Sequence, residues 1–170
     1  MHTPDDHDWF ELSATDAGLA ADDLTGAQVA RIGYSAALAN TIDEGLLNVS
    51  TTGDARRQPG DFTRQAMALQ RLVNRTIQAA MVADLMRGDD WETIAEALGN
   101  GWDAESAAYE FGEFDLKHLA SDPKALWRRV RPSWSAADPA VAATELDQWA
   151  SRHADPREAV RTDRPVTAGL

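Results

Sequence analysis

The sequence predicts an all-α fold, a compact helical domain built around a long central helix. Three observations lead to this prediction. Apolar residues recur every three or four positions over most of residues 25–153, which is the period of an amphipathic helix. Capping residues precede these stretches, and Gly or Pro stands at their ends. No stretch shows the alternation of apolar and polar residues that is typical of a half-buried strand.

Two long helices are expected first. Thr25 begins a capping box, and the helix that it opens should end near Asn48. Residues 50–60 are dense in Gly, Pro and polar residues, so we expect a loop there. Asp61 is the expected N-cap of the central helix, and Gly88 is expected to end it.

A helical hairpin is expected over residues 89–118. Asp89 and a glutamate three residues later form a second capping box. Gly99 opens a Gly-Asn-Gly turn, and the next helix should run from Trp102 to about Leu119. Two brief helices over a longer one are the arrangement that this pattern predicts.

Two shorter helices complete the domain. Each begins with an Asp-Pro pair, in which Asp is the N-cap and Pro the first helical residue. The first pair opens a helix through Val130, and the second opens a helix to about His153. On either side, residues 1–24 are expected to be a flexible acidic arm and residues 154–170 a flexible tail, because neither shows a sustained apolar period.

Composition excludes several classes of protein. With no cysteine, the chain has no disulfide and no thiolate metal site or thiol nucleophile. The four histidines are scattered, and no nucleotide-binding or hydrolase motif is present, so we expect no enzyme activity, no metal and no cofactor. The chain lacks a signal-like start and any long apolar run. We therefore expect a cytoplasmic, bacterial protein that makes no membrane contact.

Charge is unevenly distributed along the chain. The net charge is −12, and residues 89–120 hold nine acids and one base. Residues 62–88 and 121–134, by contrast, each hold four bases and one acid. Because an acidic chain is repelled from nucleic acid at long range, any DNA contact has to come from these two basic stretches.

The hairpin carries a resemblance to a known class of regulators. Trp91, Ile94, Leu98 and Gly99 follow a long helix and precede another. In this the chain resembles the helix-turn-helix domains of sigma-factor-like and related small bacterial regulators, roughly over residues 62–115. The resemblance implies that the second helix of the hairpin would enter the major groove of DNA. Here the turn is longer than in that class and the second helix is acidic, so Asp103, Glu105 and Glu110 would face phosphates. We expect these three acids to face a protein partner instead.

Two arginine sets are the other candidate contacts. One lies on one side of the central helix and the other follows Trp127, and the residues are Arg64, Arg71, Arg75, Arg128, Arg129 and Arg131. Such sets can hold phosphates or an acidic partner, and the first could also pair with the acidic helix of the same or a neighbouring copy. They also have ordinary explanations, namely the solvated side of a helix and the positive end of another that complements its dipole.

These patterns lead to two functional hypotheses. The first is a non-enzymatic helix-turn-helix regulator that acts on DNA-associated machinery, with weak DNA contact through the arginine sets and a protein partner at the acidic hairpin. The second is an acidic protein-interaction module, an adaptor or a DNA-mimicking decoy, that binds no nucleic acid. Self-association is compatible with either hypothesis.

Overall fold

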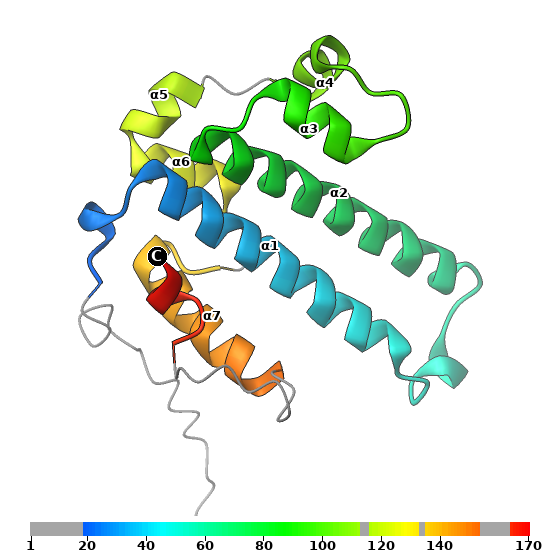
Figure 1. Ribbon diagram of the computed structural model, residues 1–170. Helices are drawn as coiled ribbons and strands as arrows, with labels where there is room; N and C mark the ends of the chain where they lie inside the picture. Colours follow the sequence, from blue (N-terminus) through cyan, green and yellow to red (C-terminus); the bar gives the residue numbers. More distant parts are fainter. Residues whose placement is uncertain (1–18, 113–115, 133–134, 154–163) are drawn as a thin grey trace, which may run out of the picture.

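The computed structural model describes residues 19–112, 116–132, 135–153 and 164–170, and every regular element in these ranges is helical (Figure 1). The α-helices are α1 (Gly26–Val49), α2 (Asp61–Arg87), α3 (Trp91–Leu98), α4 (Ala104–Phe111), α5 (Leu116–Ser121), α6 (Pro123–Val130) and α7 (Pro139–His153). Short 3₁₀ turns lie at Ala21–Asp23, Asp54–Arg56 and Thr167–Gly169. The prediction of an all-α fold is confirmed. No helix in the described ranges is long and apolar enough to cross a membrane.

Three helices, α1, α6 and α7, begin at the predicted side-chain caps. Thr25 and Gln28 form the expected capping box of α1, and Asp122 accepts a hydrogen bond from the Ala125 N–H at 2.9 Å to cap α6. Asp138 does the same for α7, through the Ala140 N–H at 2.8 Å.

Two expected caps are shifted by one residue. The N-cap of α2 is Gly60, in a left-handed conformation, and Asp61 is the first helical residue. The N-cap of α3 is Asp90, which accepts from the Thr93 N–H at 2.9 Å, and Asp89 instead forms an ion pair with Arg87. At α2, a glycine precedes the expected cap, and at α3 a second aspartate follows it. The sequence alone therefore does not show which of the two neighbouring residues is the N-cap.

The antiparallel pair of α1 and α2 is the frame of the fold. The hydroxyls of Thr41 and Thr76 lie 2.9 Å apart, and Thr76 also donates to the Ala37 carbonyl at 3.2 Å. These bonds fix the register of the two helices, because buried hydroxyls need partners. Figure 1 shows that the ends of α1 and α2 joined by residues 50–60 extend beyond the other helices.

The main core lies where α6 and α7 pack against α1. Val29 and Ile32 of α1 meet Leu126 and Trp127 of α6, and all four are almost fully buried. The indole N–H of Trp127 donates to the Ala136 carbonyl at 3.2 Å, so the one polar atom of this side chain is satisfied.

Residues on both sides of the expected domain belong to the folded body. Leu24 is buried in the core and Leu19 packs against it, so the predicted boundary at residue 25 is several residues too late. At the other end, Val166 and Leu170 pack on the core, which corrects the expectation of a flexible tail for residues 164–170. Residues 1–18 and 154–163, which the same predictions cover, lie outside the described residues.

The α3–α4 hairpin has its own geometry. Gly99, Asn100 and Gly101 have positive φ values of 66°, 54° and 81°, a succession that glycine and asparagine tolerate best. The two helices pack on each other, and the ring centroids of Trp102 and Phe111 are 5.4 Å apart.

The expected second helix of the hairpin is instead two helices. Trp102 precedes the helix, because Asp103 caps α4, and α4 ends at Gly112. Residues 113–115 lie outside the described residues, and α5 follows them. The prediction of one continuous helix was therefore wrong, because Gly112 ends α4.

Candidate arginine groove

A groove of about 700 Å³ lies between α2 and α6, with α1 as its floor. Its lining includes Arg75 from α2 and three arginines from the end of α6, namely Arg128, Arg129 and Arg131. Gln78 and Asn40 add amide groups. We call this the arginine groove. The two basic stretches of the sequence therefore meet in one place, although about fifty residues separate them.

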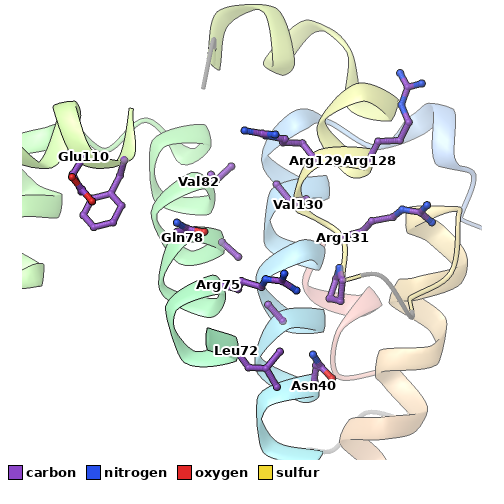
Figure 2. Close-up of a pocket in the computed structure, with 14 residues that line it drawn as sticks. Asn40, Leu72, Arg75, Gln78, Val82, Glu110, Arg128, Arg129, Val130 and Arg131 are labelled. Carbon is purple, nitrogen blue, oxygen red and sulfur yellow. The ribbon is translucent and has the colours of Figure 1, made fainter. Parts of the chain in front are cut away.

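The four guanidinium groups have different orientations (Figure 2). Arg75 and Arg129 extend into the space between α2 and α6, whereas Arg128 and Arg131 extend outward from α6. Among the described residues, no ion pair involves Arg75, Arg128 or Arg131. One carboxylate, that of Glu110, also lines the groove, on the other side of α2 from the α6 side chains. Four positive groups and one negative group give the lining an excess of positive charge.

The end of α6 places three of these arginines. Asp122 and Pro123 begin the helix, and Arg128 and Arg129 lie in its last turn, where positive charge complements the helix dipole. Val130 packs closely against Gly33 of α1, and only a residue without a Cβ leaves room for it. The contact between α1 and α6 thus sets the position of the arginines on either side of Val130.

Replacing Gly33 by alanine is expected to destabilise the protein and to disturb the groove. A Cβ at this position would lie 2.5 Å from Cγ2 of Val130, so α6 must shift or Val130 must change rotamer. Overpacking of this kind costs about 1 to 3 kcal/mol of unfolding free energy. Urea denaturation of the variant measures the loss. Gly45→Ala on the same helix, where a Cβ would meet nothing within 4 Å, is the control and should not be destabilised.

Arg64 and Arg71 lie outside the groove. Arg64 forms an ion pair with Asp61 in the first turn of α2. The Arg64 and Gln58 contacts lower the pKa of Asp61 below its usual value, with the backbone hydrogen bond from Gln58 as the larger cause. Arg71 is exposed on α2, one helical turn from Arg75, but it does not line the groove. Of the six predicted arginines, the structure therefore brings four together.

The three predicted acidic contacts also have different positions. Asp103 is a cap, because its carboxylate accepts from the Ser106 N–H at 2.7 Å and from the Ser106 hydroxyl at 2.6 Å. These two bonds, the one from the hydroxyl first, lower the pKa of Asp103. Asp103 is also exposed, and its contact with a protein partner stays a prediction. Glu105 is exposed on α4, and Glu110 is exposed and reaches the arginine groove.

The groove also contains Asn40 of α1, which the sequence analysis did not predict. A single polar residue within a helix does not reveal which neighbouring helix it faces. In the described part of the chain, no group of three His, Cys, Asp or Glu side chains is arranged to hold a metal ion.

Comparison with known proteins gave no match to a family model, a curated protein or a solved structure.

Proposed function

We propose that this chain is a non-enzymatic regulatory protein of the helix-turn-helix type that holds the phosphate backbone of nucleic acid in its arginine groove. One observation carries the proposal: Arg75 and the three arginines at the end of α6 line the same groove, and no described carboxylate pairs with Arg75, Arg128 or Arg131. Guanidinium groups match phosphate oxygens in geometry and stay charged at all physiological pH values.

The acidic hairpin would have another role in this proposal. Between residues 89 and 112 there is no Lys or Arg, and α4 has only eight residues. An N-terminal turn that carries Asp103 and Glu105 would repel the phosphates on either side of a major groove. We therefore assign nucleic-acid contact to the groove and a basic protein partner to the hairpin.

Salt dependence of duplex DNA binding tests the proposal. If each groove arginine neutralises one phosphate, the slope of log K against log salt is about −0.9 per arginine, or about −3.6 for four. Replacing both Arg75 and Arg128 by alanine should reduce the slope by about 2 units. Fluorescence anisotropy with a labelled duplex, begun at low salt, measures both affinity and slope.

The matched control is the double replacement of Arg64 and Arg71 by alanine. It removes the same two positive charges as the groove variant, but both residues lie outside the groove. The slope of this variant should stay near that of the unmodified protein. Equal losses in the two variants would mean that net charge alone governs binding, and the groove assignment would be wrong.

A specific observation also favours the second hypothesis, the acidic interaction module. Glu92, Glu96 and Glu105 are exposed on the hairpin, and no ion pair with a described residue involves them. If the unmodified protein shows no duplex binding at low salt, the first proposal fails. Binding of an arginine-rich peptide that is lost on changing these three glutamates to glutamine would then support the second.

A further inference from the structure

The arginine groove contains uncharged polar groups that a phosphate backbone alone does not require. Asn40 of α1 and Gln78 of α2 both line it, and neither amide forms a hydrogen bond with a described residue. An amide side chain has two N–H donors and a carbonyl acceptor. Because the oxygens of an ionised phosphate only accept hydrogen bonds, a phosphate can use the amide N–H groups but not the amide oxygens. The groove therefore suits a ligand that brings hydrogen-bond donors as well as phosphates.

The buried part of the lining is small and apolar. Ala37, Ala79 and Val82 are the buried residues of the groove, and the first two carry only a methyl group. The volume of about 700 Å³ is that of a small-molecule pocket, which typically has about 300 to 1,000 Å³ and combines apolar walls with a few polar groups. A nucleobase fits such a space, because its faces are apolar and its edge is polar.

The polar and charged groups surround the same space (Figure 2). Arg75 and Gln78 stand three residues apart on α2, and so share one face of that helix. Arg129 extends toward them from α6, and Asn40 lies on α1. Guanidinium groups bind phosphates, and their planes also stack on unpaired bases. A nucleotide that enters the groove can therefore place its base near the amides and its phosphate at an arginine.

Base pairing determines which nucleic acid can use the amides. In a duplex the bases are stacked and their Watson–Crick edges are paired, so a base reaches a concave site only by leaving the helix. Side chains that read a duplex project outward into its major groove, whereas Asn40 is half-buried in a groove of the protein. The bases of a single strand are free to turn out of the stack and to expose these edges. The amides therefore favour an unpaired strand.

We infer that the arginine groove binds a single-stranded segment of nucleic acid, with an unpaired base against Asn40 and Gln78. This assignment depends on the proposed function, because the same arginines hold the phosphate backbone. A duplex contacts the arginines alone, and a single strand contacts both the arginines and the amides. The four arginines of the lining favour a strand over a free mononucleotide, which brings a phosphate at one end only.

Fluorescence anisotropy with three labelled ligands of equal length tests this preference. The ligands are a duplex of mixed sequence, one of its strands alone, and a strand in which every base is missing. At low salt the duplex should bind through the arginines, and the single strand should bind about tenfold more tightly or better. The abasic strand keeps the phosphates and lacks the bases, so it should lose this advantage.

A variant without any change in charge isolates the amides. Combining Asn40→Ala with Gln78→Ala should lower the affinity for the single strand about tenfold and leave the affinity for the duplex within about twofold, because phosphate contacts set the latter. The matched control combines Gln70→Ala with Asn74→Ala, two exposed positions of α2 that do not line the groove. This control should keep the preference for the single strand. If the groove variant does not fold, the abasic strand still decides the question on the unmodified protein.

The outcomes separate this assignment from the proposed function. Binding of duplex and single strand with equal affinity overturns the single-strand assignment and leaves the proposed function in place, whereas binding of neither overturns both. An abasic strand that binds as tightly as the complete strand also overturns the assignment, because phosphate contacts would then explain all of the affinity. A nucleoside monophosphate that displaces the strand at equal concentration would make the free nucleotide the ligand and would overturn it as well.

Discussion

Replacing Trp127 by alanine is expected to lower the free energy of unfolding by about 3 to 5 kcal/mol. The side chain is 1% exposed and is the largest fully buried one among the described residues. Its removal leaves a cavity between α1 and α6 and leaves the Ala136 carbonyl without the indole donor. Since a domain of this size has a total stability of about 5 to 15 kcal/mol, this loss is a large part of the free energy of unfolding.

Urea denaturation followed by far-ultraviolet circular dichroism measures this loss. Trp102→Ala is the control, because this indole is 37% exposed and its ring pairs with Phe111. An aromatic pair contributes about 0.5 to 1.5 kcal/mol beyond the area it buries, so the control should lose much less. Equal losses in both variants would contradict the assignment of Trp127 to the main core.

The helices of this protein could be predicted because their ends are encoded locally. Thr25, Asp122 and Asp138 each satisfy backbone N–H groups within three residues, so the sequence alone contains both partners. The same local information fails where two candidates compete. Asp89 and Asp90 are chemically equivalent candidates, and in the structure Asp90 caps α3 while Asp89 forms an ion pair with Arg87.

The arginine groove could be predicted only in part. Sequence reasoning identified both basic stretches, but their convergence depends on how α6 packs on α1, through Val130 and Gly33. No local pattern encodes such a contact between distant residues. For the same reason Arg71 and Arg75, one turn apart on the same helix, were given equal weight although one alone lines the groove.

The C-terminal segment was mispredicted because its partner is distant in sequence. Residues 164–170 have no apolar period, and this absence is typical of a flexible tail. In the structure, Asp147 of α7 holds them. Its Oδ1 accepts from the N–H groups of Val166 at 2.6 Å and Thr167 at 3.1 Å, and its Oδ2 accepts from the Thr167 hydroxyl at 2.6 Å.

Replacing Asp147 by alanine is therefore expected to release this segment, at a cost of about 2 to 3 kcal/mol. The carboxylate is 6% exposed, and hydrogen bonds to a charged acceptor are the stronger kind. Hydrogen exchange at the amides of Val166 and Thr167 measures the release, and urea denaturation measures the effect on the whole domain. Because Val166 and Leu170 pack against the core, their departure also exposes apolar surface, which lowers global stability together with the local order.

Two further variants separate the hydrogen bonds from a general effect of changing α7. Asp147→Asn keeps an oxygen that can accept from both N–H groups, so we expect it to lose about 1 kcal/mol and to retain most of the amide protection. Glu145→Ala changes the same charge two residues away on an exposed position, and it should leave the segment in place. If Asp147→Ala exchanges these two amides no faster than Glu145→Ala, apolar packing alone holds residues 164–170 and the carboxylate has no part in it.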